Sequence, residues 1–282
     1  MESLDLANYW PSQPLAVVIG AGGMGATVAR RLGQRHRILL VDIDGKRLNS
    51  QAVRLQEDCM RVEVFRCDIT DRDSVAALAE RVKTIGSFSA LAHVTGLSPS
   101  MADWRQIMAV NLIGPVLVTN ALFPLVGKGC AAVLIASLSA HMTQPDQTVT
   151  TLLREPLAAD FMDRLEEAMR GEMSPQQSYS LSKHAVVQLA RRLAVTWGER
   201  GGRVVSVSPG LIASPQGLNE FKHSSSKMTL LSQCPLGRQG GMQEIADAVE
   251  FLVSTNASYI NGIDLLVDGG LQARHREANV RD

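Results

Sequence analysis

The sequence predicts an α/β protein whose single domain is built on a parallel, doubly wound sheet of about seven strands. Three observations support this class. Short β-branched runs recur along the chain, helical patterns separate them, and a glycine-rich turn joins the first run to the first helix. The expected strands are Leu15–Ile19, Ile38–Val41, Val62–Phe65, Ala90–His93, Ala131–Ala136, Val204–Val207 and Asp264–Val267.

Several of these runs are apolar nearly throughout, which is typical of strands covered on both faces. The expected helices are Met24–Leu32, Ser74–Lys83, Trp104–Val126, Ser180–Trp197 and Gln243–Ser254. In Ser180–Trp197 the apolar residues recur at steps of three and four, so this helix buries one face. Alternation of this kind predicts βαβ crossovers and therefore parallel strands.

The composition excludes several classes of protein. With 282 residues, we expect one domain over residues 1–282. Lys plus Arg equals Asp plus Glu at 28 each, so no net field favours nucleic acid or a membrane surface as a partner. The four cysteines are scattered, which argues against a metal site or a disulfide framework. The N-terminus shows no secretory signal, and we expect a cytoplasmic protein.

Two stretches depart from the alternation. Residues 141–177 separate the fifth strand from the next helix by more than an ordinary connection, and their middle, Thr151–Arg170, has a helical apolar stripe. We interpret them as a helical insertion. Residues 215–234 are rich in Ser, Gly and Lys and follow a strand end, so they are expected to be a mobile segment that covers substrate.

A dinucleotide-binding motif follows the first strand. The turn Gly20-Ala21-Gly22-Gly23-Met24-Gly25 lets the backbone approach a pyrophosphate at a helix N-terminus. Taken alone, this glycine-rich turn is also explained by tight packing between the strand and the helix, without a nucleotide. The next strand ends in Asp42, whose carboxylate can accept hydrogen bonds from ribose hydroxyls and repel a 2′-phosphate, which favours NAD over NADP. Alternatively, Asp42 begins a turn with Asp44 and Gly45.

Other charged residues near these strand ends have competing interpretations. Lys46 and Arg47 can in principle meet a 2′-phosphate, but they are expected further into the following helix. Asp68, just past the third strand, is expected at the adenine amino group. Asp71 and Asp73 suit the N-cap of the next helix.

Tyr179 and Lys183 lie four residues apart and project from one helix face. A phenol with an ordinary pKa of about 10 is a poor base at neutral pH, and a neighbouring ammonium brings it toward the working range. Ser137, at the end of the fifth strand, can donate a hydrogen bond to a substrate oxygen. The spacing of a tyrosine and a lysine four residues apart is also common by chance. In that case Tyr179 is an ordinary surface residue of the helix and Lys183 is a solvated charge.

The chain resembles the short-chain dehydrogenase/reductase family over nearly its whole length. The matching segments are Asp103-Trp104 with Val110-Asn111-Leu112-Ile113-Gly114, Ile135-Ala136-Ser137, the pair Tyr179 and Lys183, Ser208-Pro209-Gly210-Leu211-Ile212, Pro235-Leu236-Gly237-Arg238, Ala257-Ser258-Tyr259-Ile260-Asn261-Gly262 and Val267-Asp268-Gly269-Gly270. The resemblance implies a single-domain Rossmann-type fold and a hydride transfer that interconverts a secondary alcohol and a ketone.

The same resemblance implies a role for each matching residue. Tyr179 would exchange a proton with the substrate oxygen, Ser137 would orient that oxygen, Lys183 would bind ribose and lower the tyrosine pKa, and Asn111 would support a water-linked proton path. The expected cofactor contacts are Gly20, Gly22, Gly23, Met24, Gly25, Asp42, Asp68, Ile69, Gly96, Tyr179, Lys183, Pro209, Gly210, Ile212 and Ser214.

Three departures from the family pattern stand out. Ile19 replaces a threonine before a glycine loop that is one residue shorter, and His93-Val94-Thr95-Gly96 replaces a segment that carries two asparagines. His93 is expected to fill a structural position, because no cluster of metal ligands accompanies it. Ser137 and Tyr179 are 42 positions apart. The helical insertion that separates them resembles one in the bacterial 3α-hydroxysteroid dehydrogenase/carbonyl reductases. This resemblance implies an altered subunit interface, and we expect a homodimer or homotetramer.

The expected substrate is a small apolar molecule, cyclic or steroid-like, and NAD is the expected cofactor. Two other functions are compatible with parts of the pattern. A regulatory dinucleotide-binding protein would fit the altered glycine loop, although Ser137, Tyr179 and Lys183 argue for catalysis. Epimerases and dehydratases share the tyrosine–lysine pair, but they generally carry a larger C-terminal substrate domain.

Overall fold

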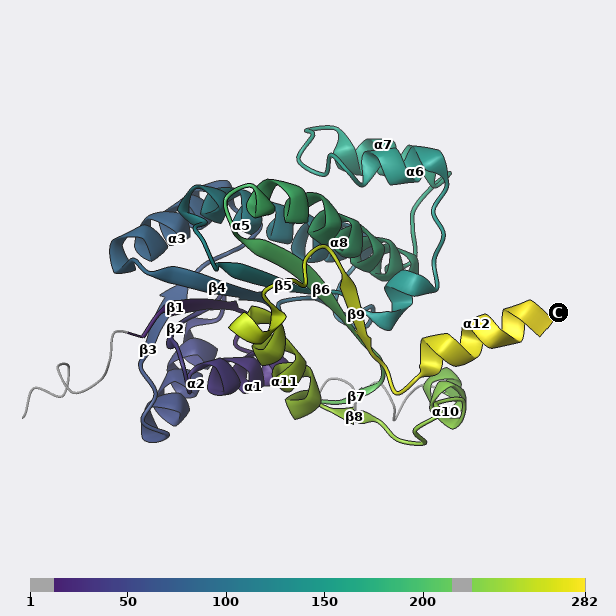
Figure 1. The fold of residues 1–282 in the computed structure, drawn as a ribbon. Coiled ribbons are helices and arrows are strands. Elements are labelled where there is room, and N and C mark those ends of the chain that lie inside the picture. The colour runs from purple at the N-terminus through teal and green to yellow at the C-terminus, as the bar shows by residue number, and fades with distance from the viewer. Residues whose placement is uncertain (1–12, 215–224, 282) are drawn as a thin grey trace, which may run out of the picture.

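The computed structural model describes residues 13–214 and 225–281, and its centre is a sheet of seven parallel strands. The strand order is β3-β2-β1-β4-β5-β6-β9 (Figure 1). The strands are β1 Leu15–Ile19, β2 Arg37–Asp42, β3 Val62–Arg66, β4 Phe88–His93, β5 Ala131–Ile135, β6 Arg203–Pro209 and β9 Asp264–Val267. The predicted parallel sheet is therefore confirmed, with strand ends that differ from expectation by one or two residues.

The order of the strands creates a crevice in the middle of the sheet. From β1 the chain moves outward through β2 to β3, and then crosses back to β4 on the other side of β1. The connections after β1 and β4 therefore run to opposite sides of the sheet. Ligands of open parallel sheets bind at this switch point, beside the carboxyl ends of the strands.

Helices cover both faces of the sheet (Figure 1). One layer holds α1 Gly23–Leu32, α2 Gly45–Glu57 and α11 Met242–Val253, and the other holds α3 Arg72–Ile85 with the helices that follow β4 and β5. Alternate strand residues enter different cores: Val17 faces the α3 layer and Val18 faces the α1 layer. Both faces of central strands such as β1 and β5 are thus buried, as the apolar runs predicted, whereas the edge strand β3 is partly exposed.

The predicted helix Trp104–Val126 is not continuous. It consists of α4 Trp104–Met108, a π-helical turn Ala109–Ile113, α5 Gly114–Leu122 and a 3₁₀ turn Phe123–Leu125. Pro115 has no N–H to donate to the carbonyl of Asn111, which removes one α-helical hydrogen bond at this place. The wider turn carries Asn111, and such turns are frequent at functional sites.

The Trp104–Leu125 stretch is also long and apolar enough to cross a membrane by composition. Its most apolar window is 61% buried inside the protein. The apolar character has a structural explanation, because Trp104, Met108 and Leu112 belong to the core between the sheet and its helices.

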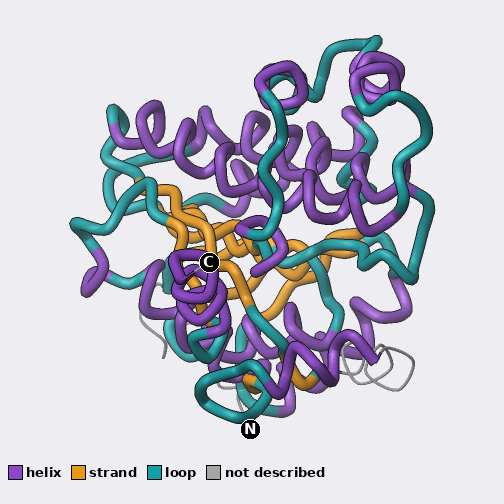
Figure 2. The backbone as a smooth tube through the Cα atoms, turned by 90° about the vertical axis from the view of Figure 1, so that its right-hand side faces the viewer, coloured by secondary structure: helices purple, strands orange, loops and turns teal. Residues whose placement is uncertain are grey.

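The insertion is helical, but its middle is not one helix. It forms α6 Gln147–Leu152 and α7 Phe161–Ala168. Pro156 lies between them, and proline disfavours helical backbone at the preceding residue. The predicted apolar stripe is confirmed, since Leu152, Phe161 and Leu165 join the core cluster that includes α8. The two helices stand outside the α8 layer, where Figure 2 shows them nearly end-on.

The helix α8 spans Pro175–Gly198, so it begins five residues earlier than predicted. Ser174 caps it by accepting a hydrogen bond from the Gln177 N–H, and the Gln177 side chain accepts one from the Ser174 N–H. This capping box and Pro175 at the first turn set the helix start. Tyr179 and Lys183 consequently lie inside a regular helix instead of at its frayed end.

The remaining elements of the described residues are short turns, two paired strands and two helices. They are the 3₁₀ turns Leu138–His141 and Thr255–Ala257, the paired strands β7 Ile212–Ala213 and β8 Gly240–Gly241, and the helices α10 Ser225–Ser232 and α12 Leu271–Arg281. The sequence did not predict β7 and β8. Of the expected substrate-covering segment, residues 215–224 lie outside the described residues, and the described remainder contains α10.

Candidate active site

The carboxyl edge of the sheet brings Ser137, Tyr179 and Lys183 to one region. Ser137 follows β5 directly and caps the 3₁₀ turn behind it, with its Oγ accepting a hydrogen bond from the Ser139 N–H at 3.2 Å. Helix α8 crosses behind β5 and β6 and presents Tyr179 and Lys183 on its inner side. The Lys183 Nζ lies 5.9 Å from the centre of the Tyr179 ring.

The Lys183 ammonium is enclosed by protein. Its side chain is 4% exposed, and Nζ donates a hydrogen bond to the Ile135 carbonyl at 2.9 Å. Burial lowers the pKa of Lys183 to about 8. An ammonium has three donors, so two remain for a ligand after the bond to Ile135.

Tyr179 is partly exposed at the opening of this region. Burial of the phenol raises its pKa, and a hydrogen bond with the Ser137 side chain acts in the opposite direction. The protein without ligands therefore keeps Tyr179 protonated at neutral pH. A protonated phenol can donate its proton to a carbonyl oxygen. Positive charge near the phenol would stabilise the phenolate, which can accept a proton from an alcohol.

Asn111 is buried and holds the loop after β4. Its Oδ1 accepts from the Leu97 N–H at 2.7 Å, and its Nδ2 donates to the Leu97 carbonyl at 2.9 Å. Both polar ends of the side chain are thus committed to backbone. Gly96 precedes this contact, and a Cβ there would lie 3.0 Å from the Lys183 Nζ and 3.4 Å from the Asn111 Oδ1.

His93 fills the interior at the end of β4, as the sequence analysis expected. It is 2% exposed, and burial together with the Lys183 charge lowers its pKa to about 3. The imidazole is therefore neutral, and its Nε2 has no hydrogen-bond partner among the described residues. The amides of Val94 and Thr95 both donate to the Ile19 carbonyl, so the altered segment still joins β4 to β1.

A buried polar network behind Ser137 was not predicted from the sequence. The His141 Nε2 lies 2.7 Å from the Asp264 Oδ2, and the Asp264 Oδ1 accepts from Ser206 at 2.5 Å and from Ser208 at 3.1 Å. This network ties the turn after Ser137 to β6 and β9. Its members are up to 123 positions apart, so no local pattern could have indicated it.

The glycine loop combines close backbone packing with open space at the N-terminus of α1. Gly20 has φ +105°, and a Cβ there would lie 2.6 Å from the Thr95 Oγ1. A Cβ at Gly25 would lie 1.8 Å from the Gly20 carbonyl oxygen, so strand and helix touch there. At Gly22, by contrast, a Cβ would meet nothing within 4 Å. Gly22 and Gly23 therefore border open space at the N-terminus of α1, and Met24 packs partly against the core.

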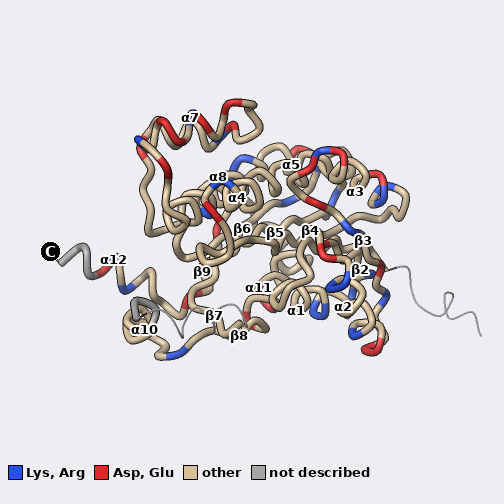
Figure 3. The backbone as a smooth tube through the Cα atoms, turned by 180° about the vertical axis from the view of Figure 1, so that it is seen from behind, with Lys and Arg blue, Asp and Glu red and all other residues tan. Residues whose placement is uncertain are grey.

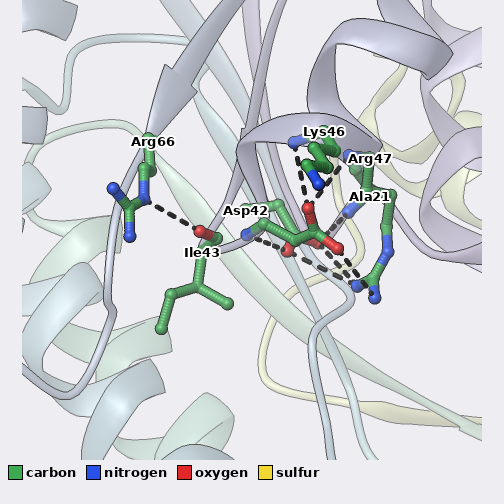
Figure 4. Close-up of polar contacts among 7 residues, drawn as sticks. Ala21, Asp42, Ile43, Lys46, Arg47 and Arg66 are labelled. Atoms are coloured by element: carbon green, nitrogen blue, oxygen red, sulfur yellow. Dashed lines mark hydrogen bonds and ion pairs between the residues drawn. The ribbon is translucent and has the colours of Figure 1, made fainter.

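Asp42 lies at the end of β2 and is engaged by backbone (Figure 4). Its Oδ2 accepts from the Ala21 N–H at 2.7 Å, and its Oδ1 accepts from the Asp44 N–H at 2.9 Å. The cofactor and turn interpretations therefore do not exclude each other, because a carboxylate accepts about four hydrogen bonds in all.

Arg47 lies in the helix that follows β2, as expected, and its side chain contacts Asp42. Its Nη1 is 3.5 Å from both Asp42 carboxylate oxygens (Figure 4). Its place in α2 therefore does not keep Arg47 away from the end of β2. The helix starts directly behind Asp44, its N-cap, so the long arginine side chain reaches back over the first turn.

The third strand end is organised around Asp68. Its Oδ1 accepts from the Thr70 N–H at 2.9 Å and from the Thr70 hydroxyl at 2.7 Å. Asp71 is the N-cap of α3, which confirms one of the two expected capping residues. The Ile69 side chain is buried against Gly114 of α5, so only its backbone can face a nucleotide.

The remaining predicted cofactor residues follow β6. Pro209 ends this strand, and Gly210 lies so close to Asp268 that a Cβ would approach its Cα to 2.6 Å. Ile212 is buried in β7, and Ser214 is the last residue described before the gap. Among residues 13–214 and 225–281, no group of three or more His, Cys, Asp or Glu side chains is arranged to hold a metal ion.

Comparison with known proteins identifies the family. The family model described as enoyl-(acyl carrier protein) reductase matches residues 19–159 and 167–272. The short-chain dehydrogenase/reductase bsc3 of Alternaria brassicicola is 31% identical over 93% of this chain and 97% of its own length. The chain belongs to the short-chain dehydrogenase/reductase family. The resemblance inferred from the motifs is thus confirmed.

Two further similarities concern a bacterial relative and the fold. The 3-alpha-hydroxysteroid dehydrogenase/carbonyl reductase of Comamonas testosteroni is 28% identical over 75% of this chain and 87% of its own length. An actinorhodin polyketide ketoreductase solved with NADPH has a TM-score of 0.74 at 22% identity, covering 92% of this chain and 97% of that one. Members of this family are oxidoreductases of CH–OH donors that use a nicotinamide cofactor.

Proposed function

We propose that this short-chain dehydrogenase/reductase interconverts a secondary alcohol and a ketone with NAD(H). The observation that carries the proposal is the placement of Ser137, Tyr179 and Lys183 at the carboxyl edge of the sheet, on the same edge as the glycine loop. Hydride chemistry would be supplied by the nicotinamide when the dinucleotide is bound. The protein's own part is to hold the reactants and to move one proton.

The residues present fit a dinucleotide. Open space at Gly22 lies at a helix N-terminus, where unpaired N–H groups and the helix dipole favour a pyrophosphate. Ribose hydroxyls would donate to Asp42 in place of Arg47, whose contacts of 3.5 Å are the longest that this carboxylate makes. Lys183 retains two donors. Asp68, Gly96, Pro209, Gly210, Ile212 and Ser214 are the further contacts that we propose along the same edge.

We assign the proton transfer to and from the substrate oxygen to the Tyr179 hydroxyl. In the reductive direction, the protonated phenol donates to the substrate oxygen as negative charge develops on it, and the Ser137 hydroxyl donates a second hydrogen bond. In the oxidative direction, the nearby Lys183 ammonium stabilises the phenolate. Asn111 contributes by fixing the loop that carries Gly96 against Lys183, and we propose that it also borders the proton path.

Asp42 and Arg47 together set the choice of cofactor. We favour NAD because the Asp42 carboxylate is nearly buried and would repel a 2′-phosphate at close range. Arg47 weakens this preference, since its guanidinium already lies within 3.5 Å of that carboxylate and is half exposed. NADP is therefore the alternative that a direct comparison must test.

The substrate is proposed to be an apolar, cyclic or steroid-like alcohol. The proposal is supported by the similarity to the 3-alpha-hydroxysteroid dehydrogenase/carbonyl reductase and by the resemblance of the long Ser137–Tyr179 separation to that subgroup. We further propose a cytoplasmic homodimer or homotetramer whose only other partner is this small molecule, with no nucleic acid or membrane, because the net charge is zero.

The test is a spectrophotometric assay of NAD(H) turnover with secondary alcohols and their ketones, hydroxysteroids included. Replacing Tyr179→Phe removes the proton donor while preserving the ring, so turnover is expected to fall by about 10²- to 10⁴-fold. NADH binding, followed by fluorescence, should remain. A Tyr179→Phe protein that retains full turnover would overturn the proposed role, and the Tyr259→Phe protein serves as control because Tyr259 is fully exposed.

A further inference from the structure

A cavity of about 320 Å³ lies between the inserted helix α6 and the outer side of α8. Its apolar walls come from Leu153, Ala185 and Val195, and Thr150 and Gln188 add polar groups. The volume is in the range of sites for small molecules. The cavity does not include any of the residues that we assign to the dinucleotide or to the reacting substrate.

Three arginines line this cavity: Arg154 from the insertion, and Arg191 and Arg192 from α8. Within residues 13–214 and 225–281, none of the three forms an ion pair with a carboxylate. Other arginines near the insertion are paired, as Arg105 is with Asp163 and Glu166. The cavity therefore gathers positive charge without its own counter-ion.

The arrangement is unfavourable for the empty protein. Arg192 is partly buried, and burial lowers the pKa of its guanidinium, with the charge of Arg154 acting in the same direction. Like charges held near one another in a partly desolvated place destabilise the folded state. A bound anion would remove this cost.

His184 supplies a further polar contact. Its Nδ1 lies 3.2 Å from the Ala140 carbonyl oxygen and donates to it, which fixes the ring and leaves Nε2 as the atom available to a ligand. The ring belongs to the lining of the cavity. His184 follows Lys183 directly, so α8 carries the catalytic lysine on one side and this cavity on another.

From these observations we propose that the cavity binds a compact, multiply charged anion, namely the phosphate group of a small molecule. Guanidinium groups donate paired hydrogen bonds that match phosphate oxygens, and several of them together favour a dianion over chloride. The apolar walls would accommodate a short carbon chain attached to the phosphate.

The surroundings argue against a large polyanion as the ligand. Helix α7, which contacts α6, carries Asp163, Glu166 and Glu167, and Figure 3 shows acidic positions concentrated along it. Nucleic acid or an anionic membrane approaching this face would meet that acidic surface. A small anion can enter the cavity without contacting it.

The experiment measures thermal stabilisation and calorimetric binding of inorganic phosphate, pyrophosphate and glycerol phosphate, with sodium chloride at matched ionic strength as reference. Saturating NADH is present, because the N-terminus of α1 is a second place for phosphate. The wild-type protein should bind at least one phosphate compound saturably. Each arginine removed should weaken that binding by about tenfold, the amount expected for a charged hydrogen bond.

The variants are Arg192→Gln and the double change Arg154→Gln with Arg192→Gln. Arg54→Gln is the matched control, since Arg54 is an exposed arginine of α2 in the opposite helix layer. Without anion, the double variant should melt no lower than the wild type, because it loses only unpaired like charges. This distinguishes lost binding from lost folding.

Two results would overturn the proposal. One is phosphate binding that is equal in the wild-type and double-variant proteins, which would assign the effect to another site. The other is a salt-sensitive self-association in sedimentation that the double variant abolishes while phosphate has no effect, because the arginines would then serve contact between copies. If glycerol phosphate binds more tightly than inorganic phosphate, the ligand is a phosphate ester; equal binding indicates free phosphate.

Discussion

At the scale of single residues, the chemistry of this enzyme depends on how little water reaches Lys183. The ammonium keeps one protein acceptor, the Ile135 carbonyl, and burial holds the lysine pKa near 8. In the unfolded chain the pKa is near its ordinary 10.5. The folded state thus disfavours the charged form. This cost is fully present below the folded pKa and is lost as the pH rises toward 10.5.

This shift predicts how stability changes with pH in the nucleotide-free protein. Between pH 8 and 10.5 the unfolded state holds the Lys183 proton more strongly than the folded state does, so the contribution of Lys183 to stability rises with pH. The expected gain is up to about 3 kcal/mol. Urea unfolding of the wild type and of Lys183→Met across this range measures it, because only the wild type should show the added slope. Parallel curves would mean that Lys183 is hydrated in solution.

Gly96, in the loop after β4, packs closely against the Lys183 ammonium. A methyl group from Gly96→Ala would lie 3.0 Å from the Lys183 Nζ and must displace either the ammonium or the loop held by Asn111. We expect a loss of about 1–3 kcal/mol in stability and a fall in kcat larger than any change in melting temperature explains. Gly127→Ala is the control, since a Cβ there meets nothing within 4 Å. Unchanged kcat in Gly96→Ala would show that the lysine has room to move.

At the scale of elements, the insertion is held on the enzyme mainly by apolar contact. Leu165 of α7 is fully buried, whereas Arg105 of α4 reaches Asp163 and Glu166 at the surface with 46% of its side chain exposed. Exposed ion pairs contribute little, because water and salt screen them. A buried leucine contributes several times more.

These magnitudes give a direct comparison of two variants. Leu165→Ala is expected to cost about 2–5 kcal/mol in the free energy of unfolding. Arg105→Ala is expected to cost about 1 kcal/mol or less, including its stacking on the Trp104 ring. Chemical denaturation measures both. Equal losses would indicate that the ion pairs, and not the apolar stripe, hold the insertion in place.

At the scale of the whole molecule, the sheet order brings the cofactor and catalytic residues to one edge although they come from distant parts of the chain. A dinucleotide bound at that edge as proposed would contact loops after β1, β2, β4, β5 and β6. A dinucleotide should therefore stabilise the entire domain and not only its first half, since it binds the folded state alone.

Thermal unfolding in the presence of NADH or NADPH tests both the stabilisation of the whole domain and the choice of cofactor. At about 100 times its dissociation constant, NADH should add about 2.7 kcal/mol, which corresponds to a rise in Tm of about 5–10 °C. NADPH should give a smaller shift at the same concentration because of Asp42. Arg47→Ala should reduce the NADPH shift further while leaving the NADH shift in place. A larger shift with NADPH would reverse the assignment and give Arg47 the dominant part.

The architecture and most of the candidate site could be predicted from local sequence patterns. Apolar runs of strand length separated by helical patterns require a parallel sheet covered on both faces, so seven strands and the flanking layers were predictable. Glycines after β1, the serine after β5 and the tyrosine–lysine pair were found because their spacing is local and their context is a strand end or one helix face.

Features that depend on contacts between distant parts of the chain could not be predicted in this way and became visible only in the folded protein. Pro115 and Pro156 disfavour regular helix, but whether a π turn or a complete break results depends on what packs around them. The reach of Arg47 to Asp42, the buried network of His141 and Asp264, and the arginine cavity on α8 join residues from separate elements. Their energies arise from burial and proximity, which a one-dimensional pattern does not contain.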